Sequence, residues 1–526
     1  MAEKALRIFK RLRVPDITGT PTNDEVCEQW VFDLVRVIFG SYDPEARRRM
    51  IRNFFLMIPK KNGKSSISAA IIVVAAILND RPMAELILIA ETQNIAKIAF
   101  RQAQGIIELD DGIKALFRVN TNLKEITHLN TGAVIKILSA DGDVVTGSKA
   151  AYVLIDETHV LGHKAKAAEV FLEIEGGLSS RPEGFVLEIT TQSKVPPHGE
   201  FKKRLDRARD VRDGRLDLPM LPIIYEFPEA MQKDRRWEDE VNWALVNPNL
   251  ERSTSLDVLR SKFIEAKDSG PESLALFASQ FLNVQIGLGL MSNAWAGAPY
   301  WEAAAEPGLD FDAIIRRCDV VVAGIDGGGL DDLVALSLIG REKGSRRWLH
   351  WVRAWAQPDV LERRKSIVPR LRDFEADGDL VICTSTDQDA AEIAEICKRV
   401  NEAGLFPETA GIGLDAFGVA TILDALDEAE LGALTAAVPQ GYKLQSAINT
   451  VPRKIKDRTM RHCGQAIMAW SVGNAKAELK GSNIVVTKQA AGAAKIDPFM
   501  ATMNAAILML ANPVASAAAA YTYDGM

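Results

Sequence analysis

A short basic loop between two apolar segments places the strongest constraint on the fold of this chain. The run Asn53–Ile58 predicts a β-strand, the letters PKKNGKS fill positions 59–65, and Ser65–Leu78 predicts a buried helix. A strand, a loop and a helix that begins with Gly-Lys-Ser present backbone N–H groups and a helix N-terminus to the phosphates of a nucleotide. Because Ile58 stands where the usual motif has its first glycine, the motif is degenerate, and a basic turn that caps a helix stays open as the alternative.

Two carboxylates that follow the apolar strand Tyr152–Ile155 strengthen the nucleotide interpretation. In such a site Lys64 reaches the outer phosphates and the Ser65 hydroxyl takes Mg²⁺. Asp156 is then placed to hold the Mg²⁺ shell, and Glu157 to orient or deprotonate the attacking water. A solvent-facing Asp-Glu pair at a strand end is the alternative.

Further polar residues complete the predicted nucleotide site. The run Glu188–Ser193 ends another apolar strand with hydroxyl and amide groups that can sense a γ-phosphate, although a plain polar turn fits equally well. Gln29 can read an adenine edge, and the two loop lysines can contact phosphates or remain solvated. The residues predicted to bind the nucleotide or its ion are Gln29, Lys60, Lys61, Asn62, Gly63, Lys64, Ser65, Asp156, Thr191 and Gln192.

The chain of 526 residues is too long for one ordinary core and predicts two or three domains. Apolar β-rich runs alternate with helical periods up to about residue 193, which favours an α/β domain with a largely parallel sheet. A polar, proline-containing stretch follows, and the composition shifts again near Gly287–Pro307. A second α/β unit then opens with three runs, at 320–325, 333–339 and 348–355, that predict an antiparallel meander. We predict domains at 1–200, 201–300 (a linker or lid) and 301–513, with a frayed tail at 514–526.

Composition limits the classes of protein to which the chain can belong. The 63 Lys and Arg against 70 Asp and Glu give a net charge of −7, which excludes a globally basic nucleic-acid coat but not local basic tracks. The five cysteines form no CxxC pair, which disfavours a disulfide scaffold or a zinc ribbon and suits a reducing cytoplasm. No signal peptide is evident at the first residues, and neither Ser65–Leu78 nor the Ala-rich Pro498–Tyr521 is predicted to span a membrane.

Three aspartates of the second half can form a metal site. Asp326 ends the run 320–325 and is followed by three glycines, Asp415 ends 411–414, and Asp497 precedes Pro498 and a long apolar helix. Oxygen ligands of this kind suit a pair of Mg²⁺ or Mn²⁺ ions, which can activate water and stabilise the leaving oxygen of a phosphodiester. An N-cap with Pro at the first helical position explains Asp497 equally well.

Two further carboxylates are weaker candidates for the same metal site. Asp332 can be a peripheral ligand or a solvated turn residue. Asp387 is more simply a helix cap.

Together these motifs resemble the large terminase subunit of tailed bacteriophages. The resemblance runs from about Gln29 to Ala511 and rests on the ordered set PKKNGKS, VLIDETHVLG, EITTQS, GIDGGGLDDLVAL, GLDAFG and KIDPFMATMNAAILML. It implies an α/β chain with an N-terminal P-loop ATPase domain of the ASCE type and a C-terminal RNase H-like nuclease domain. The residues that match the family's catalytic acids are Glu157, Asp326, Asp415 and Asp497, and those that match its metal ligands are Ser65, Asp156, Asp326, Asp415 and Asp497.

The resemblance also implies a function and partners. ATP hydrolysis, with Mg²⁺, would drive double-stranded DNA into a procapsid, and a nuclease using Mg²⁺ or Mn²⁺ would cut concatemeric DNA. The implied partners are DNA, the portal protein, the small terminase subunit and further copies of the chain in a ring. The implied location is the host cytoplasm, with transient docking on the portal and no membrane. Candidate DNA-contacting residues are Arg47, Arg48, Arg49, Arg52, Arg453, Lys454, Lys456, Arg458 and Arg461, all of which can equally be solvated.

One departure from the family pattern concerns the phosphate loop. Many relatives carry an arginine there, whereas this loop offers only Lys60 and Lys61, so an arginine-like role in the transition state would need a residue from elsewhere. Two other functions stay open on the sequence. One is a helicase-like or remodelling ATPase whose RNase H-like domain only binds, and the other is a capsid-assembly adaptor without turnover.

Overall fold

The chain divides into two compact units, Met1–Ile286 and Gly287–Met526. The structure is a computed structural model, and it describes residues 1–90, 92–139, 150–164, 166–287, 294–415, 420–480, 483–488 and 495–516. Most of the predicted tail, residues 517–526, lies outside the described residues.

The described part of the first unit is built on an eight-stranded sheet with the order β10-β3-β9-β8-β4-β7-β6-β5. The strands from β10 to β7 are parallel, and β6 and β5 extend the sheet as an antiparallel hairpin. The phosphate-loop strand β3 therefore lies inside the sheet, between β9 and β10. The strand bounds are β3 Asn53–Met57, β4 Glu85–Ala90, β5 Phe117–Asn120, β6 Glu125–His128, β7 Val134–Ser139, β8 Ala150–Asp156, β9 Phe185–Thr190 and β10 Met220–Ile224, with a separate pair β1 Tyr42–Asp43 and β2 Arg48–Arg49.

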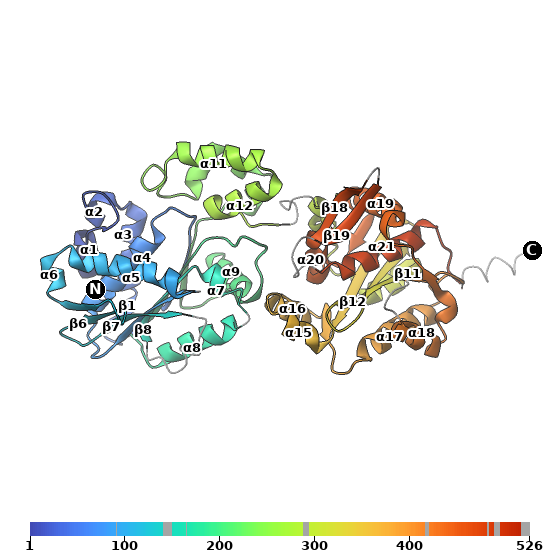
Figure 1. Cartoon of the computed structure of the whole chain (residues 1–526), viewed down its shortest axis with the longest axis horizontal. Coiled ribbons are helices and arrows are strands. Elements are labelled where there is room, and N and C mark those ends of the chain that lie inside the picture. The colour runs from blue at the N-terminus through green and yellow to red at the C-terminus, as the bar shows by residue number, and fades with distance from the viewer. Residues whose placement is uncertain are drawn as a thin grey trace, which may run out of the picture. The chain divides into compact units, whose positions relative to one another are not determined.

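Helices cover both faces of this sheet, with α4 and α5 above it and α8 below it in Figure 1. Alternate residues of β3 face opposite sides: Phe54 and Leu56 join the core under α1, α3, α4 and α5, whereas Phe55 and Met57 pack with α9. Strands buried on both faces read as continuous apolar runs, which is why the sequence shows these segments clearly. The helices of this layer are α1 Ala2–Arg11, α2 Asn23–Val26, α3 Gln29–Gly40, α4 Lys64–Leu78, α5 Gln93–Glu108, α6 Asp111–Lys114, α7 Thr158–Leu161, α8 Ala167–Ser179 and α9 Gly199–Arg212.

The segment expected as a separate linker at 201–300 does not form a compact unit of its own. Residues up to Ile286 belong to the first unit, because β10 pairs in parallel with β3 and α9 packs beneath it. The short helices that follow lead into α11 and α12, which lie at the top of this unit in Figure 1. Their bounds are α10 Glu229–Lys233, the 3-10 turns η2 Arg236–Glu238 and η3 Glu240–Leu245, α11 Leu256–Asp268 and α12 Pro271–Leu282.

The second unit contains a mixed sheet with the order β14-β13-β12-β11-β15-β16, to which β17 adds beside β13. Strands β11, β12 and β13 form the predicted antiparallel meander, whereas β14, β15, β16 and β17 pair in parallel with their neighbours. The bounds are β11 Cys318–Gly327, β12 Leu333–Glu342, β13 Trp348–Ala356, β14 Leu380–Ile382, β15 Ile412–Leu414, β16 Thr435–Ala437 and β17 Met460–His462, with a separate hairpin β18 Ala475–Lys480 and β19 Asn483–Lys488.

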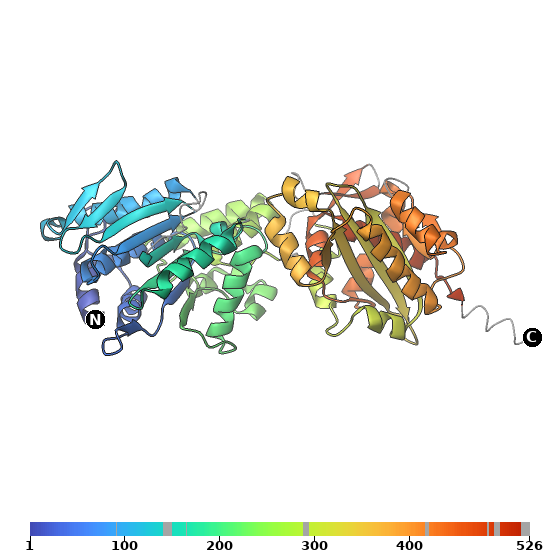
Figure 2. The same ribbon diagram turned by 90° about the horizontal axis from the view of Figure 1, so that it is seen from below.

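Two helical layers enclose this sheet. In Figure 1 α17 and α18 lie below the strands and α19, α20 and α21 above them, and Figure 2 shows the strands between helices from another side. The helical segment after β13 is divided into two helices, α15 and α16, because Pro369 near the start of α16 has no N–H and favours a new helical start. The helices are α13 Ala298–Trp301, η5 Glu302–Ala304, α14 Phe311–Arg317, α15 Pro358–Arg363, α16 Val368–Ala376, α17 Gln388–Glu402, α18 Ala420–Glu428, η6 Gly432–Leu434, η7 Gly441–Leu444, α19 Gln445–Lys456, α20 Ala466–Asn474 and α21 Asp497–Leu510.

No helix among the described residues is long and apolar enough to cross a membrane. The two apolar stretches noted in the sequence correspond to α4 and α21, and each packs against a sheet. Their hydrophobicity is thus accounted for by burial within the two units.

Two buried histidines in the second unit predict a pH-dependent stability. His462 stacks on Trp301 at 4.2 Å and its Nε2 lies 2.7 Å from the Trp301 carbonyl, and His350 Nε2 lies 2.9 Å from the Thr502 hydroxyl. Burial lowers the pKa of His462 to about 4 and that of His350 to about 3. The unfolded chain binds protons near pH 6.5 and the folded chain does not, so stability present at pH 7 is lost as the pH falls toward 4.

We expect the free energy of unfolding of the second unit to fall by about 2 kcal/mol per histidine between pH 7 and pH 5. Urea unfolding of the full chain, followed by tryptophan fluorescence, measures this difference. His462→Gln removes one of the two titrating groups and should flatten the pH dependence. An equal fall in the variant and the parent would contradict the assignment.

Candidate functional site

The phosphate loop joins β3 to α4, as the sequence predicts. Its turn depends on Gly63, which caps α4 with a left-handed backbone (φ 77°) that a glycine adopts without strain. The first turn of α4 presents the N–H groups of a helix that continues for four turns, so the loop backbone and the helix N-terminus face the same point. This is the arrangement needed to bind an anion.

Lys64, Ser65 and Asp156 lie together where this loop meets the end of β8. Lys64 is 7% exposed with its Nζ 3.4 Å from the Ile58 carbonyl, and the Ser65 hydroxyl donates to Asp156 Oδ2 over 3.4 Å. Burial lowers the pKa of Lys64, while burial and the neighbouring Glu157 raise the pKa of Asp156 to about 6. A hydroxyl and a carboxylate side by side, next to a buried ammonium, fit the donor set for Mg²⁺ and phosphate.

Glu157 occupies a strained position at the end of β8. Its backbone is left-handed (φ 52°), which is uncommon for a residue with a side chain, and its Oε2 lies 3.2 Å from His159 Nδ1. Burial opposes ionisation of Glu157, but the hydrogen bond from His159 and the charge of Lys64 outweigh it and lower the pKa to about 2. A carboxylate held ionised in this way is suited to orienting a water molecule, and less to keeping a proton taken from it.

His159 also connects Glu157 to the end of β9. Its backbone N–H donates to the Thr190 hydroxyl over 3.0 Å, and its Nδ1 lies 3.1 Å from the same oxygen. His159 is not among the residues predicted from the sequence, although its place two residues after Glu157 in the run ETHVLG was a usable signal. The contact ties the predicted catalytic carboxylate to the predicted γ-phosphate sensor.

Thr191 and Gln192 follow Thr190 and are fully buried. The Thr191 hydroxyl and the Gln192 amide nitrogen have no hydrogen-bond partner among the described residues. Buried polar atoms are costly unless they are satisfied, so these two are open to a bound group. They follow β9, the strand that pairs with β3, and so lie next to the phosphate loop, a position that fits the predicted nucleotide contact.

Four other residues predicted to bind the nucleotide have different surroundings. The Gln29 amide is exposed and donates to Asp33 on the same helix over 2.8 Å, so its contact with an adenine edge stays a prediction. The Asn62 side chain is fully buried and bonds to protein groups, which makes it a support of the loop. Lys60 is half-buried, and Lys61 is exposed with a left-handed backbone (φ 69°).

The three aspartates of the second unit gather at one end of its sheet. Ile325 and Leu414 are register partners in the parallel pair β11–β15, so Asp326 and Asp415, which come directly after them in the chain, follow side by side. Asp497 is the first residue of α21, which packs on β11, and it is 3% exposed. A Cβ added at Gly327 would lie 3.3 Å from Asp497 Oδ1, which places this carboxylate against the residue that follows Asp326.

Asp497 does not cap its helix. The N-cap position is Ile496 and Asp497 lies within the first turn, so the alternative explanation from the sequence is not observed. As they stand, no three His, Cys, Asp or Glu side chains among the described residues are arranged to hold a metal ion. The chemistry of the side chains nevertheless suits a divalent cation, because Asp326, Asp415 and Asp497 all offer carboxylate oxygens as ligands.

Asp332 and Asp387, the two weaker candidates for metal ligands, have other surroundings. The Asp332 carboxylate accepts a hydrogen bond of 2.6 Å from the buried Lys495, which also donates to the Asp331 carbonyl. Asp387 is exposed at the N-cap of α17 and follows β14. Strands β13 and β12 lie between β14 and β11, so Asp387 is far along the sheet from Asp326. Lys495 therefore brings a buried positive charge to the turn that precedes Asp497.

Two family models match the chain and identify its family. The family model for the terminase large subunit ATPase domain matches residues 30–208, and the model for the terminase large subunit endonuclease domain matches residues 224–512. The chain belongs to the terminase large subunit family. It carries an ATPase domain followed by an endonuclease domain, which imply the use of a nucleotide and of divalent metal ions.

Individual terminases are distant relatives of this chain. The terminase large subunit of Lactococcus phage p2 is 19% identical over 500 residues, which cover 93% of this chain and 87% of that protein. The large terminase of bacteriophage HK97 is 18% identical over 96% of this chain and 99% of its own, with a TM-score of 0.48. The magnesium-bound large terminase nuclease of phage G20c matches 36% of this chain at 14% identity, with a TM-score of 0.24.

Some of the basic residues predicted to contact DNA are structural in this terminase. Arg49 is buried and donates to the carbonyls of Glu183 and Ile38, and Arg52 donates to the carbonyls of Leu178 and Arg181. These guanidinium groups satisfy backbone acceptors inside the ATPase unit. Because Arg49 is also buried, the prediction that it contacts DNA is wrong, whereas Arg52 is half-buried and stays a candidate. Arg47 and Arg48 remain exposed, as do three of the residues around the end of α19, namely Arg453, Lys456 and Arg458.

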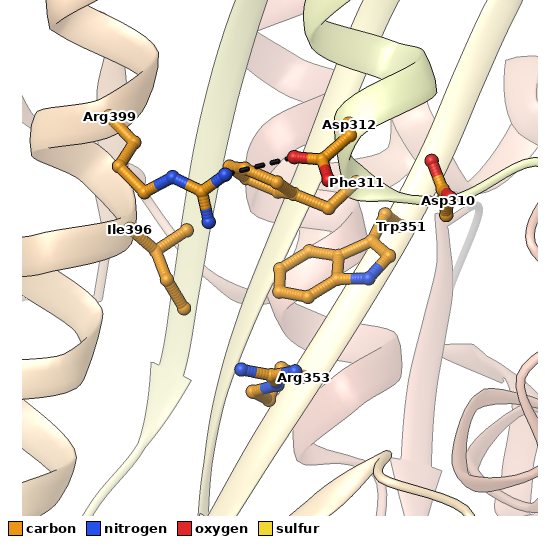
Figure 3. A pocket seen from close by; sticks show the side chains of 7 residues that line it. All are labelled: Asp310, Phe311, Asp312, Trp351, Arg353, Ile396 and Arg399. Atoms are coloured by element: carbon orange, nitrogen blue, oxygen red, sulfur yellow. Dashed lines mark hydrogen bonds and ion pairs between the residues drawn. The ribbon is translucent and has the colours of Figure 1, made fainter.

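A separate cavity of about 300 Å³ lies in the nuclease unit, where α14 begins near β13 and α17 (Figure 3). Arg399 donates to Asp312 over 2.9 Å and lies over the Phe311 ring at 4.4 Å. The Trp351 ring lies edge-on beside Phe311, with the ring centroids 5.4 Å apart, and Arg353 lies beyond Trp351. None of the three aspartates at the sheet end lines it. The cavity is therefore distinct from the predicted metal site.

Proposed function

We propose that this chain is the motor and nuclease of a DNA-packaging machine. ATP hydrolysis in the first unit drives double-stranded DNA into a procapsid, and the second unit cuts concatemeric DNA at the start and end of packaging. The observation that carries the proposal is that one chain of the terminase family holds a phosphate loop with its two acids and, separately, three carboxylates at a sheet end.

In the ATPase site each residue has a distinct task. The loop N–H groups and Lys64 bind the phosphates, while Ser65 and Asp156 hold Mg²⁺. Glu157, kept ionised by His159 and Lys64, orients the attacking water, and Thr191 and Gln192 contact the γ-phosphate. The low pKa of Glu157 makes positioning of the water its main contribution.

In the nuclease site Asp326, Asp415 and Asp497 hold divalent cations, with Mg²⁺ the resident ion and Mn²⁺ an alternative. Such cations would supply an activated water and stabilise the leaving oxygen of the phosphodiester. Asp326 and Asp415 come from adjacent strand ends and Asp497 from the start of α21, so three separate elements fix the site.

The proposed partners follow from the packaging role. They are double-stranded DNA, the portal protein, the small terminase subunit and other copies of this chain in a ring. The work takes place in the host cytoplasm, with the ring docked transiently on the procapsid portal. The net charge of −7 fits a motor that moves along DNA on limited basic tracks and does not clamp its phosphates.

Lys64→Ala tests the proposal. Removal of the ammonium that meets the outer phosphates should abolish DNA-stimulated phosphate release and ATP-dependent packaging, while Mg²⁺-dependent cleavage of plasmid DNA persists. Lys114→Ala, at an exposed position in α6, is the matched control. A wild-type chain without measurable ATP turnover would favour an assembly adaptor, and one that hydrolyses ATP but never cleaves DNA would favour a remodelling ATPase with an inactive second domain.

A further inference from the structure

Three buried asparagines join the phosphate loop to a segment almost two hundred residues later in the chain. The Asn62 side-chain amide donates to Asn247 Oδ1 over 2.9 Å. The Asn249 backbone N–H donates to Asn62 Oδ1 over 3.1 Å, and the Asn249 side-chain amide donates to the Asn62 carbonyl over 2.9 Å. We call Asn62, Asn247 and Asn249 the asparagine clamp.

The clamp is shielded from water. Asn62 is 0% exposed, Asn247 2% and Asn249 7%. Amide hydrogen bonds at such depth do not compete with solvent, and removal of one partner leaves the other unsatisfied. The clamp therefore holds the backbone of the loop immediately before Gly63, where a small shift would turn the phosphate-binding N–H groups away.

The clamp is itself anchored on both sides. Asn249 Oδ1 accepts a hydrogen bond of 2.8 Å from the Trp30 indole, and the Asn247 amide donates to the Phe281 carbonyl in α12 over 3.1 Å. The other flank of the loop meets the same helix, because the Lys60 N–H donates to the Gln280 carbonyl over 2.9 Å. Both sides of the phosphate loop thus depend on the end of α12.

The same helix end also holds the predicted γ-phosphate sensor. The Gln280 amide donates to the Gln192 carbonyl over 2.8 Å, and the Gln192 N–H donates to Asn283 Oδ1 over 2.9 Å. Gln280 and Asn283 are fully or almost fully buried. Any movement of the loop or of Gln192 on nucleotide binding should therefore displace the end of α12, and with it α11, which packs beside α12.

We propose that Asn247 and Asn249 are positioning residues of the ATPase site, which fix the phosphate loop through Asn62 and connect nucleotide occupancy to the helix pair α11–α12. They do not touch the nucleotide and act only through the loop backbone. The inference rests on the ATPase function of the first unit.

The variants Asn249→Ala and Asn249→Asp test the proposal. The alanine removes the amide that holds the Asn62 carbonyl, and the aspartate keeps the shape but replaces that donor with a charge repelled by phosphate. Loss of a buried hydrogen bond of this kind corresponds to a rise of roughly tenfold in the KM for ATP. We expect kcat to change less than KM, with the larger effect in the aspartate variant. Asn242→Ala is the matched control, because its amide bonds to the Arg236 carbonyl and not to the loop.

Amide hydrogen exchange measures the connection to α11–α12. With Mg²⁺ and ADP added, peptides from residues 256–282 of the wild-type chain should gain protection, and the gain should be lost in both Asn249 variants but kept in Asn242→Ala. A role in folding alone would lower the unfolding temperature and leave the KM of the folded enzyme unchanged. An unchanged KM, or undiminished protection in both Asn249 variants, would overturn the inference, whereas an inactive wild-type chain would instead overturn the ATPase assignment.

Discussion

Glu157→Gln is expected to bind ATP with nearly wild-type affinity and to hydrolyse it roughly 10²–10⁴-fold more slowly, the usual contribution of a positioned acid or base. The amide retains the size of the side chain and a contact with His159, but it loses the charge that Lys64 and His159 stabilise. Water next to a neutral amide is less polarised and less well directed at the γ-phosphate. The change therefore separates binding from turnover.

Fluorescent-nucleotide titration and single-turnover phosphate release measure the two quantities separately. Glu173→Gln on the exposed side of α8 provides a control of the same chemistry. Hydrolysis at the parental rate in Glu157→Gln would remove this residue from the catalytic step. A loss of ATP affinity equal to the loss of rate would show that its main role is in binding.

Asp326→Asn and Asp415→Asn should each reduce metal-dependent DNA cleavage by more than about a hundredfold, since even outer-shell partners of a metal site are worth roughly 10–100-fold. The two residues follow register partners in β11 and β15, and either change removes one negative charge from the site. ATP hydrolysis should be unaffected, because the ATPase residues lie in the other unit.

Plasmid cleavage with Mg²⁺ and with Mn²⁺ measures this effect. Asp387→Asn is the control, because this exposed residue follows β14, which two strands separate from β11 in the sheet. Cleavage that survives undiminished in both Asp326→Asn and Asp415→Asn would refute the site and leave a binding domain without nuclease activity.

The sequence predicted the structure best for strands that are buried on both faces of a sheet. The strands that carry Asp156, Thr190 and Asp326 are continuous apolar runs, and their positions in the structure differ from the prediction by a residue or two. Within the first unit, the polar ends of β8 and β9 could be predicted to meet because parallel strands end at one edge of a sheet. Family motifs then supplied the roles of the residues.

The remaining features depend on contacts between distant segments. The run NPN at 247–249 is typical of a turn, and nothing in it reveals that Asn62 lies across from it. Strand β10 contains Pro222 and is only half-buried, so its pattern did not distinguish it from a linker. Arg49 and Arg52 looked like surface cations because sequence cannot show which carbonyls a guanidinium will meet.

Strand β10 has a consequence for how the protein can be divided. It is contributed by residues 220–224, beyond the residue at which the match to the ATPase domain ends, yet it is the strand that covers the open side of β3. A fragment ending at Arg212 would expose the hydrogen-bonding edge of the strand that leads into the phosphate loop, and exposed edges of this kind pair with other chains. It would also lack the clamp. The smallest fragment that folds and binds a nucleotide by itself should therefore run to Ile286, and a shorter fragment should aggregate.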